Sequence, residues 1–229
     1  MILFLILITA AVILIIARVY LWAKDRELLR TVTDTRRGTR SERRLVLRLL
    51  KKGIPAVTIY HDLYVEKAPD QYSQIDAVVL TKVGIIVIEV KDYSGWIYGR
   101  GYHDYWVQSL AYGKEKHRFY NPVLQNDGHI EALRRRLRGI ADVPFYSVIL
   151  FYGNCRLRDI RDLPDDTYVG YSKEIMSIIR RITRHNPPAR YADKRGLIAL
   201  LQQSAANGEN RKIIHRHIKN IHHTTPRYD

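Results

Sequence analysis

The sequence contains little cysteine and few acidic residues. Cys155 is the only cysteine in 229 residues, which excludes an internal disulfide framework and a cysteine-based zinc cluster. Asp and Glu together number 23 against 38 Lys and Arg, so the formal charge is +15. This excess favours a polyanionic partner, either nucleic acid or an acidic lipid surface. Hydrophobic residues make up 46% of the chain, which is enough for one folded domain with appendages.

Charge is absent from the first segment. Residues 1–17 contain no charged side chain, and the apolar run continues to Trp22. As a helix, about 22 residues rise roughly 30 Å, the thickness of the hydrocarbon core of a bilayer. No Lys or Arg precedes the run. We therefore expect residues 1–22 to form a lipid-spanning anchor; the alternatives are a cleaved signal peptide and a buried core helix. Basic residues follow the run, so the positive-inside rule predicts a single-pass membrane protein with a cytoplasmic C-terminal domain.

The chain is expected to divide into four regions. Residues 1–22 form the anchor, and residues 23–40 form a charged juxtamembrane stem. Residues 41–155 form the folded core, and residues 156–229 form a basic, mostly helical C-terminal extension. The single thiol fits a reducing cytosol.

Apolar periodicity and turn residues predict a helix, three strands, a helix and a strand in the core. Ser41 is expected to cap the first helix, and Asn121 with Pro122 begins the second. Both faces of the hairpin strands are apolar, which is typical of a central sheet covered on two sides in an α/β layer structure. The expected elements span residues 41–53, 56–66, 74–91, 121–139 and 144–152, with later ones over 167–171, 172–182, 196–205 and 210–222.

Three charged residues interrupt the two most apolar strands. Glu89 and Lys91 are two residues apart, so in a strand they face the same way. A turn at Lys82-Val83 would place Asp76 opposite Glu89, and a turn at Val83-Gly84 would place it opposite Lys91. Either turn gathers all three residues on one face, whereas a three-residue loop would separate them.

Two carboxylates and a lysine on a half-buried patch suit a divalent-metal site. Mg²⁺ is a hard ion that prefers carboxylate oxygens together with water and substrate phosphate. An internal ion pair that only satisfies its own charges accounts for the same pattern, although buried pairs seldom give net stability. Spacing alone leaves both interpretations open.

Short motifs accompany this triad in a fixed order along residues 41–135. They are Ser41-Glu42, Gln74-Ile75-Asp76, Ile88-Glu89-Val90-Lys91, Gly95-Trp96-Ile97-Tyr98-Gly99, Trp106, Asn121-Pro122-Val123-Leu124-Gln125-Asn126 and His129. Together they resemble the NERD (nuclease-related) domain, a branch of the PD-(D/E)XK nuclease superfamily. The chain departs from that family at Ser41-Glu42, where Gly-Glu is usual, and the resemblance does not extend past about residue 155.

The resemblance implies a restriction-endonuclease-like αβββαβ core, with a central mixed sheet flanked by helices. It also implies that Asp76, Glu89 and the carbonyl of Val90 hold Mg²⁺, with Mn²⁺ as an alternative ion. The ion would polarise the scissile phosphate and activate a bound water. Lys91 would orient that water or stabilise the charge that develops on phosphorus.

Two further residues are candidates for the site. Glu42 would approach from the first helix and complete the metal shell, and Gln125 would contact phosphate or water. The alternatives are a solvated Glu at a helix start and an ordinary surface glutamine. His129 shares a helical face with Gln125 but is expected to pack on the helix surface, and Trp96 and Trp106 are expected in the core rather than stacked on bases.

The leading hypothesis is a membrane-anchored, Mg²⁺-dependent nuclease whose cytoplasmic domain hydrolyses phosphodiester bonds. DNA as the substrate follows from the superfamily and not from the residues. The alternative is a non-catalytic, membrane-tethered module that binds nucleic acid or protein on a nuclease-like fold. A third hypothesis is a structural protein whose basic surface presses on anionic lipid.

Overall fold

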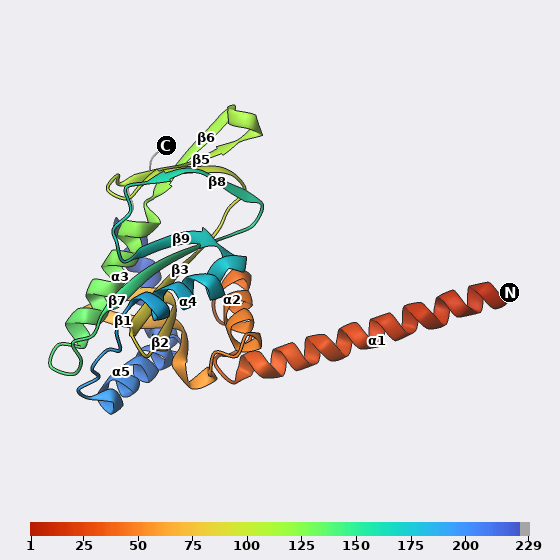
Figure 1. The fold of residues 1–229 in the computed structure, drawn as a ribbon, viewed down its shortest axis with the longest axis horizontal. Coiled ribbons are helices and arrows are strands. Elements are labelled where there is room, and N and C mark those ends of the chain that lie inside the picture. Colours follow the sequence, from red (N-terminus) through yellow and green to blue (C-terminus); the bar gives the residue numbers. More distant parts are fainter. Residues whose placement is uncertain (225–229) are drawn as a thin grey trace.

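Two mixed sheets and the helices around them make up the folded part of the chain (Figure 1). The computed structural model describes residues 1–224. The helices are α1 (Ile2–Arg30), α2 (Arg40–Lys51), α3 (Pro122–Arg136), α4 (Ile175–His185), α5 (Lys194–Asn207) and α6 (Arg211–Thr224), with 3-10 turns η1 (Ala56–Thr58), η2 (Ala111–Gly113) and η3 (Ser172–Glu174). The strands are β1 (Ile59–Ala68), β2 (Gln71–Thr81), β3 (Gly84–Asp92), β4 (Gly95–Arg100), β5 (Tyr105–Leu110), β6 (Glu115–Tyr120), β7 (Phe145–Tyr152), β8 (Cys155–Arg161) and β9 (Thr167–Tyr171).

The larger sheet, called sheet 1, has the strand order β1-β2-β3-β7-β9. Its first three strands are antiparallel, and β3, β7 and β9 run parallel. The expected order of one helix, three strands, one helix and one strand is present as α2, β1, β2, β3, α3 and β7. The predicted fold class, mixed α/β with a central sheet flanked by helices, is confirmed.

Sheet 1 is buried on both faces, as the doubly apolar strands indicated. Ile86 and Ile88 of β3 pack with α2 and α4 on one side. Ile85 and Val87 pack with α3 and α5 on the other. At about 25 cal/mol per Å² of apolar surface removed from water, this central layer supplies the largest hydrophobic contribution to folding.

Sheet 2, with the strand order β6-β5-β4-β8, lies over one end of sheet 1 (Figure 1). Its inner face carries Ile97 and Trp106, which pack against Ile149 and Phe151 of β7. The ring of Trp106 stacks on that of Phe151 with the centroids 6.2 Å apart. Trp106 is therefore a core residue, as expected. Trp96, which was also expected in the core, is only partly buried and lies beneath the guanidinium of Arg158. The short strands β4, β5, β6 and β8 were not predicted, because strands exposed on one face carry only half of the apolar signal.

Helix α2 begins differently from the prediction, which placed its N-cap at Ser41. The N-cap is Thr39, whose hydroxyl oxygen accepts a hydrogen bond from the backbone N–H of Glu42 at 3.3 Å. The same hydroxyl donates to Oε1 of Glu42 at 2.6 Å. Thr39 and Glu42 have the spacing of a capping box, which explains why the helix starts one residue before Ser41. The hydroxyl of Ser41 instead donates to Asp92.

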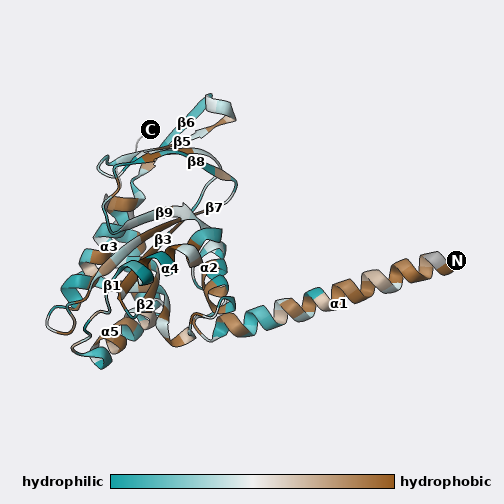
Figure 2. Cartoon of the chain, viewed as in Figure 1, coloured by the Kyte–Doolittle hydropathy of each residue, from teal (hydrophilic) through white to brown (hydrophobic). Residues whose placement is uncertain are grey.

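Helix α1 projects from the domain as a single long rod (Figure 1) and is apolar along its outer part (Figure 2). Residues Phe4–Arg30 have a mean hydropathy of 2.7 in their most apolar window, and none of that window is buried. By length and composition this helix could cross a membrane, and its exposure excludes the buried core helix considered above. Helix α1 runs to Arg30, so the first part of the expected stem continues it.

The C-terminal extension is tied into the core. Strand β8 pairs with β4, β9 pairs with β7, and α5 packs against β1. The boundary expected after residue 155 falls inside β8, directly after its first residue. Residues 225–229, the end of the expected extension, lie outside the described part of the chain.

Candidate functional site

The register of the β2–β3 hairpin brings the predicted carboxylates together. The turn consists of residues 82–83, and Ala77 pairs with Ile88 at the far end of the ladder. One step further along this register, Asp76 faces Glu89 across the two strands. Oδ2 of Asp76 accepts a hydrogen bond from the backbone N–H of Val90 at 2.7 Å, which fixes its carboxylate beside the end of β3.

Lys91 joins β3 to helix α3. Its Nζ lies 2.7 Å from Oε1 of Glu89 and donates to Oε1 of Gln125 at 2.8 Å. Burial alone would lower the pKa of Lys91, but the carboxylates of Glu89 and Asp76 outweigh burial and hold the pKa above its ordinary value. The structure therefore gathers Asp76, Glu89, Lys91 and Gln125 around the ends of β2 and β3 and the first turn of α3.

Glu42 approaches this group from helix α2. Its side chain is buried, with 5% of the residue exposed, and Oε2 lies 3.6 Å from Nε2 of His61 on β1. Burial opposes its ionisation, but the facing imidazole of His61 and the hydrogen bond from Thr39 hold the pKa of Glu42 below its ordinary value. Gly38, at a φ of 63°, packs so closely here that a Cβ would clash with Glu42 and His61.

Two histidines therefore contact candidate site carboxylates. Nε2 of His129 lies 3.3 Å from Oε2 of Glu89, and its Nδ1 lies 2.7 Å from the hydroxyl of Ser73. The second histidine, His61, repeats the pattern between Glu42 and Thr33, whose hydroxyl is 2.9 Å from Nδ1. Glu42 and Glu89 thus each face a histidine whose other ring nitrogen contacts a hydroxyl group.

Sequence reasoning missed both histidines as parts of the site. It assigned His129 to the helix surface, whereas the residue is only 8% exposed and contacts Glu89. The helical spacing from Gln125 was the signal that placed it on the correct face. For His61 there was no signal, because its contact with Glu42 joins β1 to α2 and depends on the tertiary packing alone. Gln74, two residues before Asp76 on β2, donates to Asp62 at 2.9 Å.

The carboxylate cluster is electrostatically unbalanced. Burial, together with the like charges of Glu89 and Glu42, raises the pKa of Asp76 well above its ordinary value. Burial also opposes ionisation of Glu89, but His129 and Lys91 hold its pKa below the ordinary value. A cation beside Asp76 would remove this repulsion, because an opposite charge favours the ionised carboxylate.

The residues present fit a small divalent cation in part. Oε2 of Glu42 and Oε2 of Glu89 are buried and lack a hydrogen-bond partner by strict geometry, so both keep acceptor capacity. Within residues 1–224, however, no group of three His, Cys, Asp or Glu side chains is close enough to hold a metal ion unaided. The arrangement resembles sites in which Mg²⁺ is held by one or two carboxylates, and water and substrate complete the shell.

Comparisons with known proteins agree with the motifs. Residues 37–152, half of the chain, match the family described as nuclease-related domain, NERD. An uncharacterized protein of Bacillus anthracis is 30% identical over 141 residues, which are 61% of this chain and 65% of that protein. The chain thus spans just under two thirds of that relative's length. No solved structure matches the chain. Because the nuclease-related domain model matches half of the chain, the chain belongs to the NERD family.

Proposed function

We propose that the protein is a membrane-anchored, divalent-metal-dependent nuclease that hydrolyses phosphodiester bonds, with DNA as the substrate and the catalytic domain in the cytoplasm. The observation that carries the proposal is the convergence of Asp76, Glu89, Lys91 and Gln125 at the ends of two central strands. Phosphoryl transfer needs positioned charge rather than covalent chemistry, and this cluster offers both signs of charge at one place.

Asp76 and Glu89, with the carbonyl of Val90, would hold Mg²⁺ or Mn²⁺. When bound, the cation would supply charge to the scissile phosphate and lower the pKa of a water. The raised pKa of Asp76 supports this assignment, since a carboxylate that ionises reluctantly among like charges gains most from a cation. Glu42 would complete the shell from α2, directly or through water.

Lys91 and Gln125 would act on the substrate. Nζ of Lys91 pairs with the carboxylate of Glu89 and donates a hydrogen bond to Gln125. A cation at Glu89 would compete for that carboxylate and free Nζ of Lys91 for the attacking water or a phosphate oxygen. Gln125, at the start of α3, can contact the same phosphate or water from the other side.

The test is cleavage of supercoiled plasmid by the full chain in detergent with 5 mM Mg²⁺, a concentration on the order of those used to saturate one- or two-carboxylate sites. We expect wild-type cleavage, and a loss of at least a hundredfold in Asp76→Asn and Lys91→Ala. The matched control is Asp165→Asn, because Asp165 is an exposed carboxylate on a loop between β8 and β9. Equal rates in all four proteins would contradict the proposal.

A second function, non-catalytic binding of nucleic acid at the membrane, is favoured by one observation. Glu89 is already neutralised by Lys91 at 2.7 Å and faces His129 at 3.3 Å, as expected of an internal ion network. This function predicts salt-sensitive binding of nucleic acid that needs no divalent ion and gives no turnover. The plasmid assay distinguishes the two, because only the nuclease loses a signal when Asp76 is changed.

A further inference from the structure

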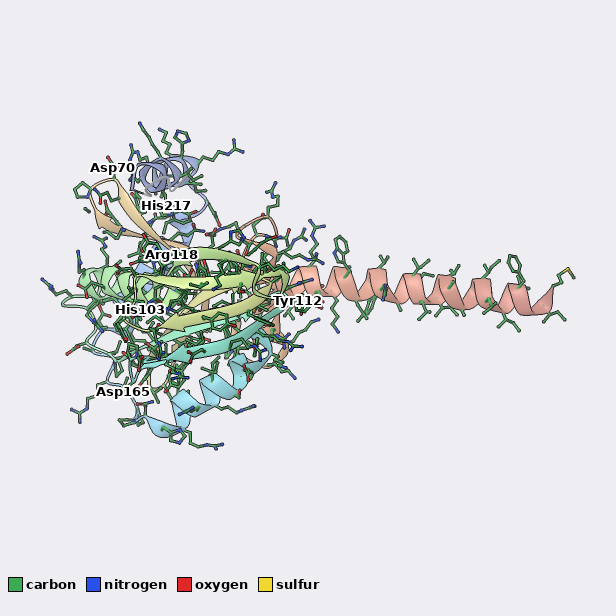
Figure 3. All side chains as sticks on the ribbon, turned by 90° about the horizontal axis from the view of Figure 1, so that it is seen from above. Asp70, His103, Tyr112, Arg118, Asp165 and His217 are labelled. Atoms are coloured by element: carbon green, nitrogen blue, oxygen red, sulfur yellow. The ribbon has the colours of Figure 1, made fainter. Side chains whose placement is uncertain are left out.

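The outer face of sheet 2 has no assigned role. Along β4, β5 and β6, the residues Ile97, Trp106 and Phe119 point inward to the core. Alternate residues of a strand point to opposite faces, so the neighbours of these three point away from the core. Seen from above in Figure 3, with Arg118 and His103 labelled, no helix within the described residues covers these strands.

Aromatic rings gather on this outer face. Trp96 and Tyr98 lie on β4, where Tyr98 pairs with Val107 of β5. Tyr105 of β5 pairs directly with Tyr120 of β6, and their ring centroids are 6.3 Å apart. Tyr120 is 50% exposed. Large aromatic side chains on an uncovered sheet face are unusual for a soluble surface and indicate a binding site.

Positive charge is interleaved with the rings. The guanidinium of Arg118 lies over the ring of Tyr105 at 4.7 Å, and that of Arg158 lies over Trp96 at 4.9 Å. Lys116 and Arg156 share the face, at register positions beside Ser109 and Trp96. Asp159 also lies here, but Arg100 and Arg161 are within ion-pair distance of its carboxylate. The surface thus alternates flat rings with cations.

We propose that the outer face of sheet 2 binds single-stranded nucleic acid, with bases stacked on the aromatic rings and phosphates held by Arg118, Lys116 and the arginines of β8. Rings stack on any base, and basic side chains track the backbone, which is the recognition mode of sequence-tolerant single-strand binders. Four strands about 4.8 Å apart give a platform roughly 14 Å wide. Sheets of this size stack two or three bases in RNA-recognition modules.

The platform is connected to the candidate site through Asn121. Its Nδ2 donates to the carbonyl of Gly101 at 2.9 Å and to that of His103 at 2.7 Å, in the loop that joins β4 to β5. Gln125 follows four residues later in α3, about 6 Å along the helix axis. A single-stranded nucleic acid that leaves the platform over this loop would therefore reach the start of α3. The choice of nucleic acid as the ligand rests on the proposed function.

The experiment measures binding of a fluorescent 20-nucleotide oligothymidine to the full chain in detergent, by anisotropy in EDTA so that no cleavage occurs. We expect Arg118→Gln and Tyr120→Ala each to raise Kd about tenfold, the loss typical of one stacked base or one phosphate contact. The matched controls are Arg181→Gln and Tyr168→Ala. The guanidinium of Arg181 lies 5.7 Å from the ring centroid of Tyr168, and neither residue belongs to sheet 2. The control variants should bind as wild type does.

Several results would overturn the inference. They are equal affinities in wild type and both sheet 2 variants, no binding by wild type, or equally tight binding of a blunt duplex of the same length. A change from oligomer to monomer in Tyr120→Ala, with unchanged affinity for the oligonucleotide, would identify the face as a self-contact and would also overturn it. Thermal unfolding of each variant checks that it is folded.

The same design separates this inference from the nuclease proposal. The variant Asp165→Asn, an exposed position outside both the platform and the candidate site, should keep both oligonucleotide affinity and cleavage. Tight binding by wild type that Arg118→Gln and Tyr120→Ala weaken, without cleavage by any of the proteins, would remove the nuclease proposal and leave the platform. Cleavage that needs Lys91 but is indifferent to Arg118 and Tyr120 would remove the platform and leave the nuclease.

Discussion

At the scale of single residues, the three buried carboxylates of the candidate site differ in how easily they ionise. His61 and His129 face the oxygens of Glu42 and Glu89 and favour their ionised forms. For Asp76, burial and the charges of Glu89 and Glu42 outweigh the backbone N–H of Val90 and the charge of Lys91. A shift of one pKa unit corresponds to about 1.4 kcal/mol between the two protonation states. Without a cation, Asp76 is therefore the carboxylate of the cluster that is most costly to ionise.

The first prediction concerns Asp76→Asn in metal-free protein. The pKa of Asp76 is raised by folding, so its favourable contribution is present below its ordinary value of 3.8 and is lost as the pH rises through the raised value. Above that range, removing the charge should stabilise the fold by on the order of 1 kcal/mol. Thermal unfolding in EDTA between pH 4 and pH 8 should show the variant gaining on wild type as the pH rises.

Mg²⁺ supplies the control for this prediction. A cation that binds only the folded state stabilises it by mass action, so Mg²⁺ should raise the Tm of wild type more than that of Asp76→Asn. A variant that is less stable than wild type in EDTA at every pH would contradict the electrostatic account of Asp76.

The second prediction concerns His129 as a positioning residue for Glu89. Removing it in His129→Ala leaves Oε2 of Glu89 buried without its nearest partner. Groups that orient metal-ligating side chains typically contribute ten- to a hundredfold in metal affinity or activity. We expect about a tenfold fall in kcat with little change in KM for plasmid, and a higher Mg²⁺ requirement. His129→Gln, which keeps an N–H donor, should recover part of the loss, whereas a change in KM alone would count against positioning.

At the scale of elements, the start of α3 determines where Gln125 lies. Asn121 is fully buried, and its Oδ1 accepts a hydrogen bond from the N–H of Val123 at 2.9 Å, which caps the helix. Its Nδ2 is directed to carbonyls of the β4–β5 loop, including that of Gly101 at 2.9 Å. The sequence predicted the cap alone, because the loop carbonyls belong to a strand pair that was not expected.

The third prediction separates these two roles of Asn121. Asn121→Ala loses the cap and the loop bonds, and should lower the free energy of unfolding by about 2–3 kcal/mol. Asn121→Ser keeps a capping oxygen but cannot reach the loop carbonyls, and should lose less. Urea titration of both variants measures the difference, and equal losses would mean that the cap contributes nothing.

At the scale of the whole molecule, one long exposed helix carries a domain of two sheets (Figure 1). The outer part of α1 is apolar, whereas its end near the domain carries charge (Figure 2). There Lys51 of α2 pairs with Asp25 of α1 at 2.6 Å. This contact joins α1 to the domain just after the apolar stretch.

The fourth prediction is that the anchor alone retains the protein in the membrane. The full chain should stay in the membrane pellet after alkaline carbonate extraction, and a chain lacking residues 1–24 should be soluble with its thermal transition preserved. The reason is that α1 supplies the long apolar surface and the domain has its own core. Liposome binding that survives the deletion would instead favour the lipid-surface hypothesis.

The linear pattern was sufficient for the hairpin strands, the second helix and the long apolar helix α1. Continuous apolar runs and turn residues are local, so they can be recognised along residues 85–88 or along α1 without knowledge of the neighbours. They left the parity of the turn open, and the two-residue turn at 82–83 in the structure decides that Asp76 and Glu89 share one face. The short strands of sheet 2 were not predicted, because few of their residues are buried; in β6 every residue except Phe119 is exposed.

The amino-acid sequence by itself determined which groups carry charge inside apolar strands, and so where chemistry can occur. Packing in three dimensions determined which groups those charges meet. His61 reaches Glu42 from another element, and His129 reaches Glu89 across the helix–sheet interface. The rings of sheet 2 likewise share a face only after β4, β5 and β6 have paired. Contacts of this kind join residues far apart in the chain, and their geometry is set by the burial of the whole core.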